Sequence, residues 1–480
     1  MAVLEQLEPK AVFHYFEELC NIPHPSYKEE KISNYLVDFA QKRGLEYYQD
    51  DLKNVIIIKE ATTGYESVPP IILQGHMDMV CEKEPGCTID FEQDGLQLKI
   101  EGDYITAEGT TLGGDDGIAV AYALAILDSE TIAHPRIEFV CTVSEEVGME
   151  GASGIDVSML KGRKLLNLDS EDEGIMLASC AGGCSAECSI PAMWLEKDGK
   201  EVDITLSGLV GGHSGTEIDK CRANSNLLMA RILMEAGKEY DFNIAALQGG
   251  SKDNAIPRET KATVIVKERA EEFITMIDAI AAAISNEYST SDPDIKVCSV
   301  VGNQGSFRAL TDEVSYRTIV LLNALPNGIQ AMSADIKGLV ETSLNLGILT
   351  LDEEKLSARY AVRSSVGTAK NYILNKLVLI TEQLGGKVIF TGDYPAWEYK
   401  KESKLREDMI AVFERMYGRK PEIQAIHAGV ECGILAGKLD GLDCISIGPD
   451  MIAIHTTEEK LSISSTKRVW EYVLEVLKCK

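Results

Sequence analysis

Long hydrophobic runs are missing from this sequence of 480 residues. The longest apolar stretch, IAVAYALAIL from Ile118 to Leu127, falls well short of the ~20 residues that a membrane-spanning helix needs. The N-terminal segment, MAVLEQLEPK, lacks the basic start and the apolar core of a secretion signal. We therefore expect a cytoplasmic protein that has no membrane partner.

Positive charge is also scarce. Lysine and arginine number 47 against 76 aspartates and glutamates, which gives a formal net charge of −29. This charge repels the phosphate backbone of nucleic acids at long range, so we expect no nucleic acid partner. The 12 cysteines occur in a chain without a secretion signal, and we expect them to be reduced thiols and not a disulfide framework.

The first part of the chain alternates helical and strand patterns. The short apolar runs NVIII (54–58), PIIL (70–73) and IEFVCTV (137–143) are typical of strands that are buried on both faces of a sheet. An apolar helix expected over 117–127 lies between two of these runs, as in a βαβ unit. The patterns predict an α/β domain whose central sheet is mixed, mostly parallel and flanked by helices.

A different pattern begins near residue 189 and then repeats. We expect two successive units of helix, strand, strand, helix and strand, over 223–301 and 312–391, with no sequence identity between them. We interpret 189–395 as an inserted α+β lid domain made of two related halves. Residues 1–188 and 396–480 are then expected to form one discontinuous catalytic domain.

One histidine and one aspartate directly follow an expected strand. His76 and Asp78 come after the run IILQ, and residues two apart in an extended segment face the same side. The carboxyl ends of strands are where open α/β sheets place their sites. Taken alone, the pair also fits a core histidine beside a solvated aspartate.

Two pairs of adjacent acids stand in similar positions. Asp115 and Asp116 follow two glycines, which allow close approach to a ligand, although acids at a helix start can also complement the helix dipole. Glu145 and Glu146 follow a strand run, and adjacent side chains that point in different directions can serve two functions. One of them can bind a metal while the other handles a proton.

Asp169 and His455 are two more possible metal ligands, each at an expected strand end or in a loop. Each acid, taken singly, also fits a solvated loop charge. Acids gathered from several segments would repel one another without cations between them. The set as a whole therefore favours a metal site.

The segments GHMDMV, GTTLGGDDG, SEEVGMEGA, NLDSEDEG and IHTTEE occur in this order. Together they resemble the motif set of the two-zinc aminoacylase/carboxypeptidase superfamily, and more closely that of the bacterial aminoacyl-histidine dipeptidases. The resemblance covers essentially the whole chain and includes LSGLVGGHSGTEI in the lid and AIHAGVECG after it. It implies a zinc-exopeptidase-like catalytic domain.

The resemblance also implies two divalent metal ions, with zinc as the first expectation and manganese or cobalt as alternatives. Asp115 is implied as the carboxylate between the two ions. The other implied ligands are His76 and Asp169 on one ion and Glu146 and His455 on the other. Two histidines and three carboxylates suit zinc or another borderline divalent ion.

Further roles are implied for residues around the metals. Asp78 is expected to hold the ring of His76, and Glu145 to be the general base toward a metal-bridging water that becomes hydroxide. His213, in GGHSG, is expected to stabilise the oxyanion from the lid, although without the resemblance it fits an ordinary polar loop residue.

Three residues are expected to bind substrate. Arg363 can grip a free carboxylate with its planar guanidinium, although it also fits a surface cation on an acidic protein. Asn254 is expected to add an amide contact, and Glu431 to bind the amino group of the substrate. His427 has no assigned role, and Asp116 stands where close relatives often have asparagine.

The resulting hypothesis is a metal-dependent dipeptidase that cleaves unmodified Xaa-His dipeptides such as β-Ala-His and Gly-His. A tripeptidase or an amide deacylase of the same superfamily shares the same ligands, and a non-catalytic peptide-binding relative is a further alternative. We expect a small peptide as the substrate. The doubled lid leaves both a monomer and a homodimer open.

Overall fold

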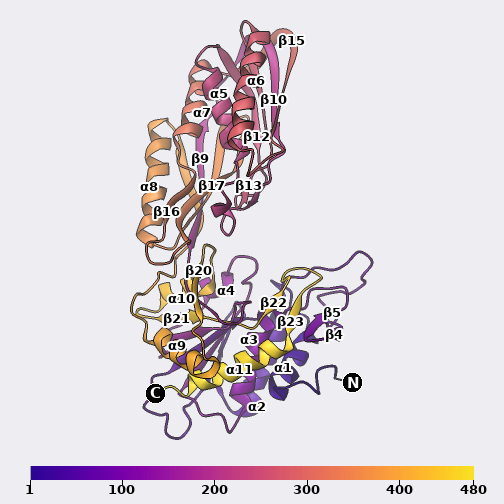
Figure 1. Cartoon of the computed structure of the whole chain (residues 1–480), viewed down its shortest axis with the longest axis vertical. Helices are drawn as coiled ribbons and strands as arrows, with labels where there is room; N and C mark the ends of the chain where they lie inside the picture. Colours follow the sequence, from indigo (N-terminus) through magenta and orange to yellow (C-terminus); the bar gives the residue numbers. More distant parts are fainter. Residues whose placement is uncertain (1) are drawn as a thin grey trace. The chain divides into compact units, whose positions relative to one another are not determined.

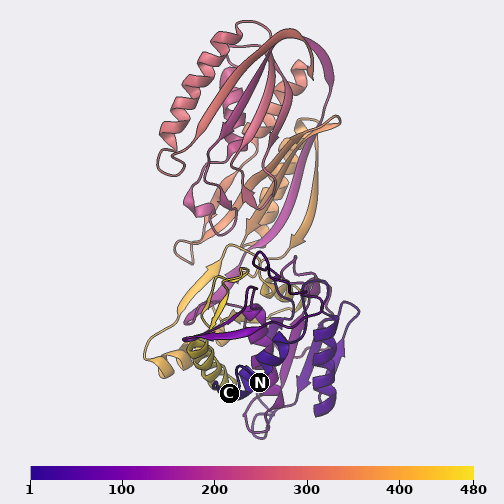
Figure 2. The same ribbon diagram turned by 90° about the vertical axis from the view of Figure 1, so that its right-hand side faces the viewer.

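The computed structural model describes residues 2–480, which divide into two compact units (Figures 1 and 2). Unit 1 comprises residues 2–180, Tyr399–Ala425 and Val430–Lys480. Unit 2 comprises Ala181–Glu398 and the short segment Ile426–Gly429. The chain thus leaves unit 1 for one long insertion and then contributes four further residues to unit 2.

A mixed sheet forms the centre of unit 1. Its strands follow the order β1-β2-β6-β3-β7-β21-β8-β20, and β6, β3, β7 and β21 at its centre are parallel to one another. Every residue of β3 and β6 is buried, which explains their continuous apolar runs. The expected mixed sheet is confirmed. The bounds are β1 (Glu46–Gln49), β2 (Val55–Lys59), β3 (Ile71–His76), β6 (Ile137–Thr142), β7 (Lys164–Asn167), β8 (Ile175–Cys180), β20 (Glu422–Ile426) and β21 (Asp443–Ser446).

Helix α3 (Gly114–Asp128) contains the longest apolar run and packs against α1 and β3. Ile118–Leu127 is buried throughout, so the helix has no polar face. Within residues 2–480, no helix has the length and apolar character needed to span a bilayer. The other helices of unit 1 are α1 (Lys10–Cys20), α2 (Glu30–Arg43), α4 (Glu150–Gly154), α9 (Lys404–Tyr417), α10 (Glu431–Lys438) and α11 (Ile463–Leu477).

A small second sheet of unit 1 joins two distant parts of the chain. Its order is β22-β23-β5-β4, with β22 (Met451–Ile452), β23 (Lys460–Ser462), β5 (Tyr104–Ala107) and β4 (Leu98–Glu101). The pairing of β23 with β5 brings the segment around His455 next to the loop that precedes α3.

Unit 2 is built on one antiparallel sheet, which Figure 1 shows together with helices α5 to α8. The sheet follows the order β15-β10-β14-β12-β17-β18-β9-β19, and β16 pairs with β17. Its larger strands are β9 (Gly182–Pro191), β10 (Trp194–Ser207), β12 (Phe242–Gly249), β14 (Thr260–Val266), β15 (Lys296–Leu310), β16 (Gly328–Met332), β17 (Val340–Leu351), β18 (Lys355–Ser364) and β19 (Lys387–Tyr394). The helices are α5 (Ser225–Ala236), α6 (Ala270–Glu287), α7 (Asp312–Ala324) and α8 (Gly367–Gln383).

The expected repeat is present in unit 2. The order α5-β12-β14-α6-β15 is followed by α7-β17-β18-α8-β19, and the halves join where β12 pairs with β17. Strands β10 and β9, which the sequence patterns did not predict, occupy equivalent places in the two halves. Because β9 pairs with β18 and β19, the chain enters unit 2 at Ala181, earlier than the expected boundary at residue 189.

Candidate metal centre and active site

Three strands of unit 1 are followed or ended by histidine and acidic residues that lie at one edge of the sheet. His76 is the last residue of β3, Asp169 follows β7 by two residues, and Glu145 and Glu146 follow β6. Because β3 is parallel to both β6 and β7, their carboxyl ends meet at the same edge. Asp115 joins them from the start of α3.

Asp115 lies between the two histidines. Its Oδ1 is 3.1 Å from His76 Nε2, and its Oδ2 is 3.1 Å from His455 Nε2. On the first side, Asp169 Oδ1 is 3.6 Å from His76 Nε2, and on the second, Glu146 Oε1 is 2.9 Å from His455 Nε2. Ligands that bind one zinc ion tetrahedrally at about 2.1 Å are about 3.4 Å apart, so each of these four distances suits two ligands of one cation.

The donor atoms form three overlapping groups in which all ligand atoms lie within 4.8 Å of one another. The groups are His76, Asp116 and Asp169; His76, Glu145 and Glu146; and Asp115, Glu146 and His455. Nitrogen and carboxylate donors in this proportion suit divalent ions of the zinc type. The side chains therefore fit two neighbouring metal ions.

The acids in this site perturb one another. Burial and the neighbouring Asp169 raise the pKa of Asp116 well above its ordinary value. Hydrogen bonds with Asp115 and Glu146 raise the pKa of His455 to about 10. Carboxyl groups crowded in this way favour a bound cation, which would replace protons as the source of positive charge.

Asp78 holds two parts of the site in place. Its Oδ1 is 3.3 Å from His76 Nδ1 and accepts the backbone N–H of Glu145 at 3.0 Å. Its Oδ2 accepts the hydroxyl of Ser26 at 2.8 Å, a contact that the sequence analysis did not include. With its Nδ1 side engaged by Asp78, the His76 ring turns Nε2 toward Asp115.

Glu145 and Glu146 share one partner and differ in another. Both belong to the group around His76, and Glu146 also lies 2.9 Å from His455 Nε2. Burial raises the pKa of Glu145 to about 8, with Asp169 and Glu146 adding to the rise and His76 opposing it. The preceding Ser144 has a φ of 53°, a left-handed conformation of the kind that clusters at functional sites.

Asp116 turns back toward β3. Its Oδ2 accepts the backbone N–H of His76 at 3.1 Å, and the side chain is fully buried. The peptide bond between Asp115 and Asp116 is cis. Asp116 therefore lies against the site and does not extend into solvent.

Glu459 is a residue of this site that the sequence analysis missed, although it lies within IHTTEE. Its Oε1 accepts the N–H of Gly114 at 2.8 Å, and its Oε2 accepts those of Leu112 and Gly113 at 2.8 and 3.2 Å. The side chain is only 2% exposed. Glu459 thus fixes the loop that ends at Asp115.

We expect Glu459→Ala to lower the free energy of unfolding by about 3 kcal/mol, because it leaves several buried N–H groups without acceptors. Denaturant unfolding followed by circular dichroism measures the change. Glu458→Ala, at an exposed neighbouring position, is the matched control and should change stability by less than about 0.5 kcal/mol. Equal effects of the two substitutions would contradict the assigned role.

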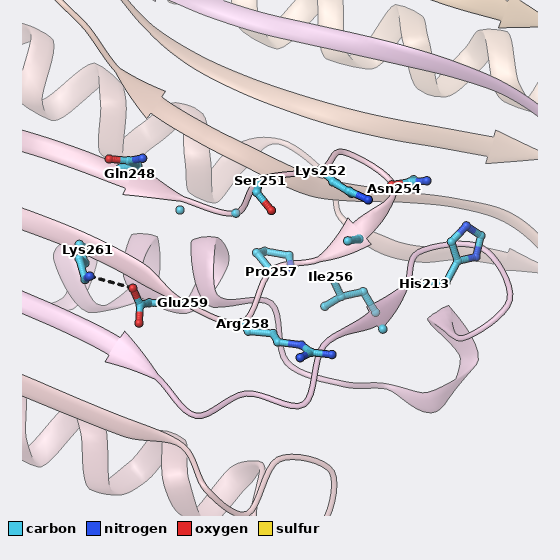
Figure 3. A pocket seen from close by; sticks show the side chains of 14 residues that line it. His213, Gln248, Ser251, Lys252, Asn254, Ile256, Pro257, Arg258, Glu259 and Lys261 are labelled. Carbon is cyan, nitrogen blue, oxygen red and sulfur yellow. Dashed lines mark ion pairs between the residues drawn. The ribbon is translucent and has the colours of Figure 1, made fainter. Parts of the chain in front are cut away.

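His213 and Asn254 lie together in unit 2. Strand β11 (Gly212–His213) pairs with β13 (Ala255–Ile256), and the N–H of Ser214 donates to the carbonyl of Asn254 at 2.9 Å. Figure 3 shows both side chains at one end of a groove that has Gln248 and Lys261 at its other end. The groove has a volume of about 940 Å³.

Arg363 and His427 meet His213 around Gly215. A side chain on Gly215 would lie 2.6 Å from the His427 carbonyl oxygen, 2.9 Å from His213 Cε1 and 3.2 Å from Arg363 Nε. Arg363 donates through Nη1 to the hydroxyl of Tyr394 at 3.2 Å. Among residues 2–480, no acceptor is hydrogen-bonded to the buried Arg363 Nε.

His427 is neutral in this setting. Burial, followed by the charges of Arg363 and His213, lowers its pKa to about 4. Its Nε2 lies 2.8 Å from the hydroxyl of Ser343. Burial and Arg363 also lower the pKa of His213.

Glu431 lies in unit 1 as the first residue of α10, and its side chain is fully buried. Its Oε2 accepts hydrogen bonds from Gln74 at 2.5 Å and from Thr142 at 2.6 Å. We expected Glu431 to bind the amino group of the substrate. In this structure no atom of its side chain is exposed for such a contact.

Similar proteins are known, some of them over the whole length of the chain. Residues 204–292 match the peptidase dimerisation domain of the M20 peptidases. The chain is 35% identical to the cytosol non-specific dipeptidase of Escherichia coli, over 100% of this chain and 99% of that protein. It is also similar to the crystal structure of aminoacylhistidine dipeptidase from Vibrio alginolyticus, with a TM-score of 0.93, 35% identity and coverage of 99% and 97% of the two chains. The aminopeptidase PepT of Bacillus cereus shares the fold, with a TM-score of 0.56 and 18% identity over 98% of each chain.

Proposed function

Because the chain belongs to the M20 peptidase family that contains the cytosol non-specific and aminoacylhistidine dipeptidases, we propose that it is a dinuclear metal-dependent dipeptidase acting on unmodified Xaa-His dipeptides. The observation that carries this proposal is the placement of Asp115, which directs one carboxylate oxygen to His76 and the other to His455. A carboxylate so placed can join two metal ions. β-Ala-His and Gly-His are the substrates we expect.

Five side chains would hold the two ions. His76 and Asp169 are assigned to one, Glu146 and His455 to the other, and Asp115 to both. When bound, divalent ions of this kind act as Lewis acids that lower the pKa of water and polarise a peptide carbonyl. Zinc fits the donor set best, with manganese or cobalt as alternatives.

The remaining residues of unit 1 are assigned to proton transfer and orientation. Glu145 takes the proton of the attacking water and passes it to the leaving amine. Its place in one group of potential ligand atoms with His76 and Glu146 supports this assignment. Asp78 keeps the His76 ring in its ligating orientation, which is supported by its contact with Nδ1.

Unit 2 is assigned to substrate recognition. Arg363 binds the free carboxylate of the dipeptide and Asn254 adds an amide contact, which is supported by the position of both residues beside His213 and Ser214. His213 stabilises the oxyanion of the tetrahedral intermediate. A requirement for a free carboxylate follows from these assignments and limits the enzyme to exopeptidase activity.

We propose that unit 1 is the catalytic domain and unit 2 its lid, in a cytoplasmic enzyme that is a monomer or a homodimer. The match to a peptidase dimerisation domain within unit 2 supports the homodimer. The cytosolic setting named for the Escherichia coli relative supports the location.

The test is amino acid release from β-Ala-His and Gly-His by protein loaded with Zn²⁺ or Mn²⁺. Release from both peptides, with none from the carboxamide of Gly-His, is the expected result. Gly-Leu, Gly-Gly-His and N-acetyl-histidine are included because they distinguish a non-specific dipeptidase, a tripeptidase and a deacylase. Metal binding without release from any of these compounds would favour a non-catalytic peptide-binding protein.

A further inference from the structure

A layer of polar side chains lies beneath the candidate metal ligands, on the same strands. Gln74 precedes His76 by two residues on β3, Asn167 precedes Asp169 by two, and Thr142 ends β6. In register, Gln74 pairs with Asn167 and Thr142 pairs with His76. All three side chains are fully buried, so each needs a hydrogen-bond partner inside the protein.

Glu431 connects this layer to the start of α10. Its Oε2 accepts from Gln74 Nε2 at 2.5 Å and from the Thr142 hydroxyl at 2.6 Å. Gln74 Oε1 in turn accepts from Asn167 Nδ2 at 2.6 Å. A single carboxyl group thus links α10 to β3 and β6 directly, and to β7 through Gln74.

The protonation of the Glu431 carboxyl group fits a structural role better than binding of a charged amine. Burial, together with the nearby Glu145, raises the pKa of Glu431 to about 8. At neutral pH the group is therefore mostly protonated and neutral. Its Oε1 has no hydrogen-bond partner among residues 2–480, and a retained proton makes this buried oxygen a potential donor.

We propose that Glu431 is a positioning residue, whose hydrogen bonds to Gln74 and Thr142 fix the strand ends that carry His76, Glu145 and Asp169. The part of this proposal that concerns catalysis rests on the proposed function. Strand ends held at the correct spacing keep the metal ligands converged before an ion binds, and groups that orient ligands in this way contribute to metal affinity.

The experiment compares Glu431→Ala with Glu431→Gln in the full-length protein. Calorimetric titration of metal-free protein with Mn²⁺ or Zn²⁺ measures affinity, and Gly-His hydrolysis gives kcat and KM. We expect Glu431→Ala to weaken metal binding and to lower kcat by about 10- to 100-fold, because Gln74 and Thr142 lose their acceptor. We expect Glu431→Gln to remain within about threefold of the wild type, because its amide oxygen can accept both bonds.

Two controls keep the test decisive. Asp440→Ala, at an exposed site after α10, should leave metal affinity and kcat unchanged. Thr142→Val removes one of the two bonds with little change in shape, and should weaken metal binding in the same direction even where Glu431→Ala fails to fold.

Several outcomes would overturn the proposal. A raised KM in both Glu431 variants, with unchanged kcat and metal affinity, would show direct contact with the substrate through charge. A lower melting temperature with unchanged metal affinity and kcat in Glu431→Ala would show a contribution to stability alone. If the wild type binds metal but hydrolyses no dipeptide, the proposed function fails, while the metal titrations still decide the role of Glu431.

Discussion

Replacing Glu145 by glutamine is expected to lower kcat for Gly-His hydrolysis by about 10²- to 10⁴-fold, the usual contribution of a positioned general base. Glutamine preserves the size of the side chain but cannot accept the proton of water. The structure places Glu145 in one group of potential ligand atoms with His76 and Glu146. Steady-state kinetics with metal-loaded protein measures the loss.

The control for this prediction separates proton transfer from metal binding. Metal content, measured by mass spectrometry, should remain at about two ions per chain in Glu145→Gln, because the proposed ligands are intact. Glu150→Gln, at the exposed first residue of α4, should have the kinetics of the wild type. A fully active Glu145→Gln enzyme would require another general base.

Asp115→Asn is expected to lose activity by about 10³-fold or more, because the metal ions supply the central chemistry of the proposed reaction. The carboxylate of Asp115 has two oxygens, one facing His76 and one facing His455. The amide of asparagine has one oxygen, so it can bind a metal ion on one of these two sides only. The bound metal should fall from about two ions per chain to about one or fewer.

Thermal unfolding provides a second measurement for Asp115. Added Zn²⁺ should raise the melting temperature of the wild type, since a ligand that binds only the folded state stabilises it, and should raise that of Asp115→Asn by less. Asp440→Asn, at an exposed site in unit 1, should respond to metal as the wild type does. Two ions per chain in Asp115→Asn would contradict the bridging assignment.

The repeat of unit 2 could be predicted from the sequence because its helices and several of its strands have local hydrophobic periodicity. Strands β9 and β10 could not be predicted in this way. Strand β9 is rich in glycine, serine and cysteine, and β10 contains charged residues at Glu196, Lys197 and Asp198. These segments are strands because β9 lies between β18 and β19 and β10 between β14 and β15. Pairing with neighbours overrides weak intrinsic preference.

The supporting residues of the site were harder to predict than the candidate ligands. Glu459 contacts Gly114, which lies 345 residues away in the sequence, and Glu431 contacts Gln74, which lies 357 residues away. Both glutamates are in segments where a solvated acid is the ordinary expectation. Their partners are known only once β23 pairs with β5 and α10 packs beside β21.

Local sequence patterns were enough to predict the alternation of buried strands and helices, the doubled pattern of the insertion, and the kinds of side chain that follow each strand. These features depend on residues close together in the chain. The family resemblance implied that Asp115 lies between His76 and His455, but only the folded structure gave the distances, which are 3.1 Å to each histidine across 39 and 340 residues of sequence. Distances between side chains depend on strand order and on loop conformations, such as the left-handed φ of 62° at His455, and no local pattern encodes either.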